Sequence, residues 1–172
     1  MGSSHKKQGK IADNNAKKSK IFSKLVRLIQ VEAKLCGGDV NSAGLKTAIE
    51  KARKASVPKD TIDRAIKKAN EVGDTTAVMY EAYGPAGTGM IITGLTNNNN
   101  RTSQEIKAAL SKNGGSLGSQ GSVAWNFTQD TERNWIPNST MEISETDKEQ
   151  LDIIIEALEE NDDVQDIYIN VK

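Results

Sequence analysis

The sequence contains one cysteine, Cys36, and one histidine, His5, among its 172 residues. A single cysteine excludes an intramolecular disulfide and fits a reducing compartment. A structural zinc site needs four nitrogen or sulfur ligands, so this composition argues against zinc. The titratable residues also suggest no nucleophile–base or acid–base pair. We therefore expect no metal site, no cofactor and no catalytic residue, and we expect a protein that is not an enzyme.

Long apolar runs are also absent. No stretch approaches the roughly 20 residues that a helix needs to cross a bilayer. The N-terminus lacks the apolar segment of a secretory signal. We therefore expect a cytoplasmic protein, with an organelle matrix as the alternative location, and neither a membrane nor a small-molecule substrate as a partner.

The formal net charge is zero, but only because two halves of the chain cancel. Residues 1–72 contain 17 Lys/Arg and 7 Asp/Glu, whereas residues 73–172 contain 6 Lys/Arg and 16 Asp/Glu. Such asymmetry indicates that the basic half binds a polyanion. The alternative interpretation is that the two halves attract each other or simply have solvated charged faces.

The basic half divides into two parts. Residues 1–19 have almost no apolar side chains and predict a flexible basic arm. Residues 20–72 predict a small domain of three helices, over about 20–35, 42–55 and 58–70, because apolar residues recur there at helical spacing. Gly37 and Gly38 are suited to end the first helix.

Cations gather on the outer faces of these predicted helices. Groups of this kind contact nucleic-acid phosphates, which position a protein without reading sequence. For any single cation a solvated face is the simpler interpretation, and the patterning of the whole set favours binding. The candidate contacts are Lys17, Lys18, Lys20, Lys24 and Arg27 on the first helix, Lys51, Arg53 and Lys54 on the second, and Arg64, Lys67 and Lys68 on the third.

Residues 73–172 predict a separate domain. The patterns indicate a strand over 89–96, a helix over 102–113, strands over 122–128 and 135–144, a helix over 145–161 and a strand over 163–171. That order predicts a ferredoxin-like, split βαβ antiparallel sheet with two helices on one face. Residues 77–83 would add an extra hairpin strand. The predicted fold class is therefore α+β.

The glycine-rich stretch "GGSLGSQGS" at 114–122 resembles a phosphate-binding loop at first sight. Phosphate loops precede a helix, whose N-terminal N–H groups point at the anion. This stretch follows a helix instead, and it lacks the lysine of a nucleotide-binding P-loop. We interpret it as a helix stop followed by a loop. A second hypothesis is that Gly118 and Gly121 let the loop enter a crowded RNA site, because glycine permits close backbone approach.

The sequence favours RNA over DNA without excluding either. No predicted helix gathers Asn, Gln and Arg to read a major groove. No aromatic platform for stacked bases is evident, because the alternation around Trp125 and Phe127 predicts that both are buried. Contacts to the backbone of structured RNA are therefore the first interpretation, and a DNA-binding protein is the alternative.

A longer stretch resembles a known family. Residues 94–127, "GLTNNNNRTSQEIKAALSKNGGSLGSQGSVAWNF", are similar to the signature of the YebC family. The resemblance extends to "VPKDTIDRAIKKA" and "YEAYGPAG" upstream, and to "WIPNST" and "DDVQDIY" downstream. It covers roughly residues 10–172. Two features depart from the family pattern: the inserted third domain between Phe127 and Trp135 is missing, and the usual Trp-containing start is not recognisable.

The resemblance implies a non-enzymatic regulator of gene expression. Bacterial members are commonly named DNA-binding transcriptional regulators, and organellar members activate translation, cytochrome c oxidase I being the type target. The family is also linked to the ribosome. Arg101 lies in the Arg-Thr pair of the motif, where it either binds RNA or braces the Asn loop. The acidic residues between Glu156 and Asp166 suggest a basic protein partner.

Overall fold

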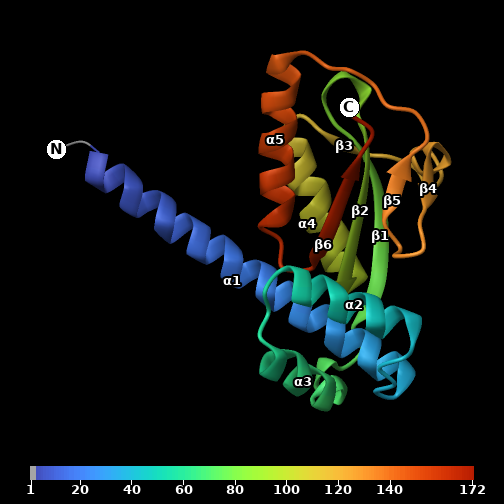
Figure 1. Cartoon of the computed structure of the whole chain (residues 1–172). Helices are drawn as coiled ribbons and strands as arrows, with labels where there is room; N and C mark the ends of the chain where they lie inside the picture. Colours follow the sequence, from blue (N-terminus) through green and yellow to red (C-terminus); the bar gives the residue numbers. More distant parts are fainter. Residues whose placement is uncertain (1–2) are drawn as a thin grey trace. The chain divides into compact units, whose positions relative to one another are not determined.

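The structure is a computed structural model that describes the backbone of residues 3–172 and the side chains from Lys17 onward. Contacts divide the chain into two compact units, Met1–Gly73 and Asp74–Lys172 (Figure 1). The sequence predicted a boundary after residue 72. No helix of the described residues is long and apolar enough to cross a membrane.

The first unit is helical. It contains α1 (Ser3–Cys36), α2 (Ala43–Lys54), α3 (Lys59–Lys67) and the short 3-10 helix η1 (Ala69–Val72). The prediction of a flexible arm over 1–19 is wrong, because α1 begins at Ser3 and runs without interruption to Cys36. Lys, Gln and Ala are good helix formers, and no proline interrupts them. Residues 1 and 2 lie outside the described residues.

The core of the first unit combines alanines with larger aliphatic side chains. Ile29 and Ala33 of α1 pack with Leu45 and Ala48 of α2 and with Ile62 of α3. Alanines at positions such as 33 and 48 let the helices approach closely. Helix α1 ends at Gly37 and Gly38, which both have positive φ, and the Gly38 N–H donates to the Ala33 carbonyl oxygen at 2.9 Å. Glycine adopts this conformation without steric cost.

The main sheet of the second unit has four antiparallel strands in the order β3-β1-β2-β6. The strands are β1 (Thr76–Tyr83), β2 (Gly89–Thr96), β3 (Ser116–Leu117) and β6 (Val164–Ile169). A turn with the 3-10 helix η2 (Pro85–Gly87) joins β1 to β2, which pair along their full length. Strand β2 is the most buried, because neighbouring side chains such as Ile91 and Ile92 are covered on opposite faces.

Two helices cover one face of this sheet, α4 (Asn99–Lys112) and α5 (Glu145–Glu159) (Figure 1). Their apolar residues Ile106, Leu110 and Ile154 pack with Met90 and Ile92 of β2. This arrangement of an antiparallel sheet with two helices on one face agrees with the predicted α+β class.

The opposite face is covered by the segment between α4 and α5. It contains the 3-10 helix η3 (Ala124–Asn126) and a hairpin of β4 (Phe127–Gln129) and β5 (Trp135–Pro137). Val123 and Phe127 pack there against Ile91. The strand assignment therefore differs from the prediction. The segment 122–128 is not a strand of the main sheet, whereas residues 77–83 form the predicted hairpin strand, which pairs with β2 along its full length.

Trp125 corrects a second prediction. Its side chain is 74% exposed, whereas Phe127 is buried as expected. The alternation argument failed because Trp125 lies in the 3-10 helix η3 rather than in a strand. The indole Nε1–H donates to the Ser122 carbonyl oxygen at 2.8 Å, which orients the ring at the surface.

Gly94 marks a point where the sheet has no room for a side chain. The pairing of β2 with β6 is irregular between Thr93 and Gly94, and the Leu95 N–H donates to the Asp163 carbonyl oxygen at 2.8 Å. A Cβ at Gly94 would lie 2.6 Å from that same oxygen. The Gly94→Ala variant is therefore expected to lose about 1–3 kcal/mol of unfolding free energy.

Urea unfolding followed by tryptophan fluorescence tests this expectation, since both tryptophans lie in the second unit. Gly84→Ala is the matched control, because the nearest atom to its added Cβ is the flexible Leu151 Cδ1 at 3.3 Å. Equal destabilisation by the two variants would contradict the importance of the close approach at Gly94.

Candidate nucleic-acid interface

The first group of predicted contacts lies along α1. Lys17 and Lys18 are exposed, and Lys20, Lys24 and Arg27 are half-buried. Lys18 also lies over the Phe22 ring, with Nζ 5.5 Å from the ring centroid. The spacing of Lys17, Lys20, Lys24 and Arg27 by three and four residues places these cations on one face of the continuous helix.

The second and third groups lie at helix C-termini. Lys51, Arg53 and Lys54 occupy the last turn of α2. Arg64 and Lys67 occupy the last turn of α3, which Lys68 caps. Cations at this end interact favourably with the helix dipole. These groups therefore have a structural role that is independent of any nucleic acid, although all of them except Lys51 are exposed.

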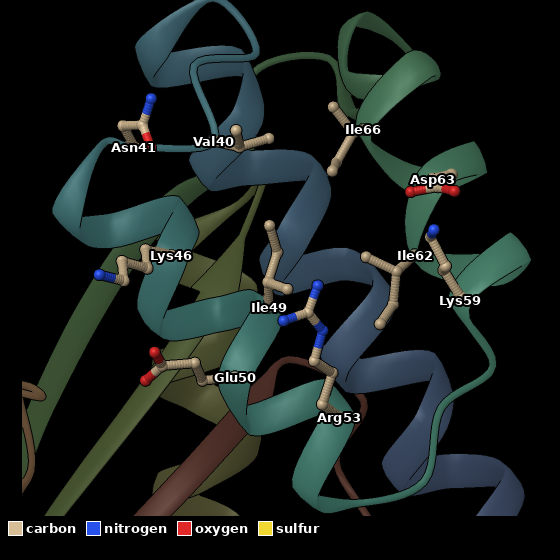
Figure 2. A pocket seen from close by; sticks show the side chains of 10 residues that line it. All are labelled: Val40, Asn41, Lys46, Ile49, Glu50, Arg53, Lys59, Ile62, Asp63 and Ile66. Atoms are coloured by element: carbon tan, nitrogen blue, oxygen red, sulfur yellow. The ribbon is translucent and has the colours of Figure 1, made fainter.

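A cavity of about 310 Å³ lies between α2 and α3. Figure 2 shows Ile49 and Arg53 of α2 on one side, and Ile62 and Ile66 of α3 on the other. Its lining combines apolar side chains with both signs of charge, the cations being Lys46, Arg53 and Lys59 and the acids Glu50 and Asp63. This mixture does not form a uniformly positive surface, so the cavity itself is a poor phosphate site.

Arg101, the candidate in the second unit, braces the Asn loop. Its guanidinium Nη2 donates to Asn97 Oδ1 at 3.2 Å and to Asp163 Oδ2 at 3.1 Å, and Nε lies 3.9 Å from Glu105. The buried Asp163 carboxylate also accepts a hydrogen bond from Thr102 Oγ1 at 2.8 Å. Of the two roles that the sequence allowed for Arg101, these contacts are those of a brace.

The glycine-rich loop binds an anionic group of the protein itself, the carboxylate of Glu81. The Gly121 N–H donates to Glu81 Oε2 at 2.6 Å. The Val123 and Ala124 N–H groups donate to Glu81 Oε1 at 2.9 and 2.5 Å. The loop therefore presents backbone donors as a phosphate loop does, and the carboxylate of β1 occupies them. Sequence reasoning missed Glu81, although a carboxylate within the otherwise uncharged strand 77–83 was a signal for it.

These contacts decide the protonation of Glu81, which is only 4% exposed. Burial by itself raises the pKa of a carboxyl group, because it disfavours the charged form. The hydrogen bonds from Ala124, Gly121 and Val123 stabilise the carboxylate, and the pKa of Glu81 lies below its ordinary value of 4.5 as a result.

The loop glycines are structural. Gly121 has φ of +86°, and a Cβ at Gly118 would lie 2.6 Å from Ser122 Oγ and 2.8 Å from the Tyr83 ring. Bulkier residues at these positions would strain the loop around Glu81. Both glycines are therefore required by the fold around Glu81, which is a role independent of the crowded RNA site that the sequence suggested for them.

The described side chains form no cluster suited to a metal. In the part of the chain whose side chains are described, no three His, Cys, Asp or Glu residues are placed to hold a metal ion. The buried carboxylates Glu81 and Asp163 are both held by hydrogen bonds from the protein itself.

Glu81→Gln is expected to lower the unfolding free energy by about 1–3 kcal/mol at pH 7, because an amide replaces a buried carboxylate that accepts hydrogen bonds from three backbone N–H groups. The pKa of Glu81 is lower in the folded than in the unfolded chain. The carboxylate therefore stabilises the fold above the unfolded-state pKa, and this contribution is lost as the pH falls through the folded-state pKa.

Urea unfolding of both proteins at pH 7 and at decreasing pH measures this effect. The difference between wild type and Glu81→Gln should shrink on acidification. Glu149→Gln, at an exposed position of α5, is the control and should change little at any pH. A difference between wild type and Glu81→Gln that is independent of pH would contradict the role of the charge.

Comparison with known proteins identifies the family. Residues 3–72 match the family described as TACO1/YebC protein N-terminal domain. Residues 75–133 and 128–171 match the TACO1/YebC second and third domain. The two segments of the second match meet in the β4–β5 hairpin, where the sequence indicated a missing domain.

Several bacterial relatives carry the name probable transcriptional regulatory protein. The relative from Thermosipho africanus is 34% identical over 221 residues, which cover 92% of this chain and 88% of the relative. The relative from Fervidobacterium nodosum is 44% identical over 160 residues, which cover 89% of this chain and 62% of the relative. An alignment of 221 residues exceeds the 172 residues of this chain, so the relative contains residues that this chain lacks.

A solved structure shares the fold. The conserved hypothetical protein Aq1575 from Aquifex aeolicus superposes with a TM-score of 0.77 at 28% identity, and the match covers 91% of each chain. The domain matches and the bacterial relatives lead to the same assignment. The chain belongs to the TACO1/YebC family.

Proposed function

We propose that this protein is a non-enzymatic regulator of gene expression that binds structured RNA or the ribosome through its helical unit. The observation that carries the proposal is the separation of charge between the two units. The first unit contains 17 Lys/Arg and 7 Asp/Glu, whereas the second contains 6 and 16. A positively charged unit attracts a polyanion, and an acidic unit on the same chain is repelled by it.

The proposed contacts are the eleven cations of the helical unit from Lys17 to Lys68 that the sequence singled out. They supply phosphate contacts, which give affinity without sequence readout. Arg101 stays the twelfth candidate, with its guanidinium already engaged by Asn97 and Asp163. The sequence of the first unit suggests no base-reading cluster, so recognition of shape and backbone is the mode that we propose.

A DNA-binding transcriptional regulator is the second candidate function. The observation that favours it is the name of the bacterial relatives, probable transcriptional regulatory protein. The same cations would serve both candidates, because phosphate contacts do not distinguish the two nucleic acids. A direct comparison of the two ligands is therefore needed.

The α1 cations are expected to set the salt dependence of binding. Replacing Lys17, Lys20, Lys24 and Arg27 by Gln should reduce the slope of log K against log salt on duplex DNA by about 0.9 for each phosphate that is no longer neutralised. The control replaces four exposed lysines of the second unit, Lys107, Lys112, Lys148 and Lys172, and changes the net charge equally. An equal reduction of the slope in both variants would mean that net charge, not the α1 face, determines binding.

Ribosome co-sedimentation over the same salt series separates the two functions. Ribosome binding that survives salt at which duplex DNA binding is lost supports the translation role. DNA binding that equals or exceeds ribosome binding, with a preference among sequences, supports the transcriptional role. Binding to neither ligand would contradict both candidates and the basic interface.

A further inference from the structure

Strand β1 is paired on one side along its whole length but on the other side only at its end. Strand β2 pairs with all of Thr76–Tyr83. Strand β3 pairs only with Ala82 and Tyr83. Within the described residues, no strand pairs with the β3 side of β1 from Thr76 to Tyr80. This segment is an open sheet edge.

The backbone groups at this edge can be assigned from the ladder. Alternate residues of an antiparallel strand direct their N–H and C=O groups to opposite neighbours. The Glu81 carbonyl oxygen accepts the Gly118 N–H at 2.8 Å, so Glu81 faces the β3 side. Ala77 and Met79 therefore direct their N–H and C=O groups to the same side, where the ladder of described strands does not continue.

The Glu81 side chain explains why the ladder stops. After Gly118 the chain would continue antiparallel to β1 if it remained extended. Instead, the Glu81 carboxylate binds the N–H groups of Gly121, Val123 and Ala124, and the chain turns across the face of the sheet. The contact that orders the loop therefore also leaves the edge of β1 open.

A hollow lies beside the edge of β1 at the point where its pairing with β3 ends. It has a volume of about 360 Å³ and is lined by Met79, Tyr80, Glu81, Leu117, Gly118 and Gln120. Met79 is 41% exposed there, although it is a large apolar side chain. The site thus offers both a backbone edge and an adjacent pocket for a side chain.

Between Thr76 and Tyr80 the edge lacks the devices that normally protect sheet edges, and the buried charge of Glu81 lies just beyond it, where the Glu81 carbonyl oxygen already accepts the Gly118 N–H. Natural proteins place Lys, Pro, a bulge or an inward-pointing charge at such positions to prevent pairing with other chains. The segment Thr76–Tyr80 contains no charged residue and no proline. Its pairing with β2 is regular throughout, and the irregularity of β2 lies only on the β6 side.

We propose that this edge binds an extended segment of a partner protein as an added strand, and that basic residues flank the segment. Added strands bind through main-chain hydrogen bonds, and pockets for alternate side chains give specificity. The basic flanks follow from charge, because the second unit contains 16 Asp/Glu against 6 Lys/Arg. The same acidity disfavours pairing of this edge with the β1 edge of a second copy, since the two acidic second units would repel each other.

The test uses a synthetic probe, the peptide Lys-Lys-Thr-Val-Thr-Val-Thr-Lys-Lys with blocked ends. The control peptide has Glu in place of every Lys. Binding is measured by fluorescence anisotropy at low salt. Amide hydrogen exchange by NMR then locates the peptide on the full chain. The basic peptide should protect the amides of Ala77 and Met79, and the acidic peptide should bind at least about tenfold more weakly.

Variants at Met79 separate edge pairing from folding. Met79→Lys places a charge at the edge, and Met79→Pro removes an N–H that points away from β2. Both variants should therefore bind the basic peptide about tenfold or more weakly than wild type does. Met79→Val is the matched control and should bind as wild type does. Thermal unfolding of all three variants shows whether each of them folds. If Met79→Pro fails to fold, Met79→Lys still tests the edge.

Results of three kinds would overturn the proposal. The first is no binding of the basic peptide at about 1 mM. The second is protection that omits Ala77 and Met79, or equal binding of the acidic peptide. The third is self-association through β1, seen as a dimer in sedimentation equilibrium that Met79→Lys converts to a monomer, which would make a second copy the occupant. These peptide measurements do not depend on whether the protein binds the ribosome or DNA, so the two proposals can fail separately.

Discussion

The carboxylate of Glu81 organises the second unit. Three backbone N–H groups of the loop after β3 converge on it, and a buried carboxylate is tolerated only with partners of this kind. The contact turns the chain from the edge of β1 onto the face of the sheet that α4 and α5 leave uncovered. Val123 and Phe127 can then pack on Ile91, and the β4–β5 hairpin follows.

This packing also explains how the chain closes without the residues that its relatives insert. The matched family segments meet at residues 128–133, between β4 and β5. Gln129 pairs with Trp135, and the Asp130 carboxylate accepts the N–H groups of Glu132 and Asn134 at 2.9 and 2.8 Å. A short Asp-stabilised turn therefore connects two strands that are already held against the sheet, and an insertion at this turn leaves the core unchanged.

The family motif around the Asn loop has a comparable structural basis. Asn98 caps α4 by accepting the Arg101 N–H, and Thr102 Oγ1 donates to the Asp163 carboxylate. Asp163 lies just before β6, more than 60 residues away in the sequence, and its carbonyl oxygen accepts the Leu95 N–H. The two motif stretches "TNNNNRT" and "DDV" thus form one polar network, buried at Thr96, Thr102 and Asp163, that joins β2, α4 and β6. A binding role is not needed to explain them, and the proposed interface consequently rests on the helical unit.

The sequence by itself determined the family, the α+β class, the division of charge and the helices apart from the N-terminal half of α1, because these depend on local periodicity, composition and motif spacing. It also indicated that the glycine-rich loop does not bind nucleotides, since a helix precedes that loop. Only the tertiary structure decided where the strands pair, because strand order depends on contacts between distant residues. The short apolar run around Trp125 has the same pattern in a strand and in a 3-10 turn, so its exposure was not predictable. Glu81 appeared as an ordinary acidic residue until the fold brought three N–H groups from 40 to 43 residues away onto its carboxylate.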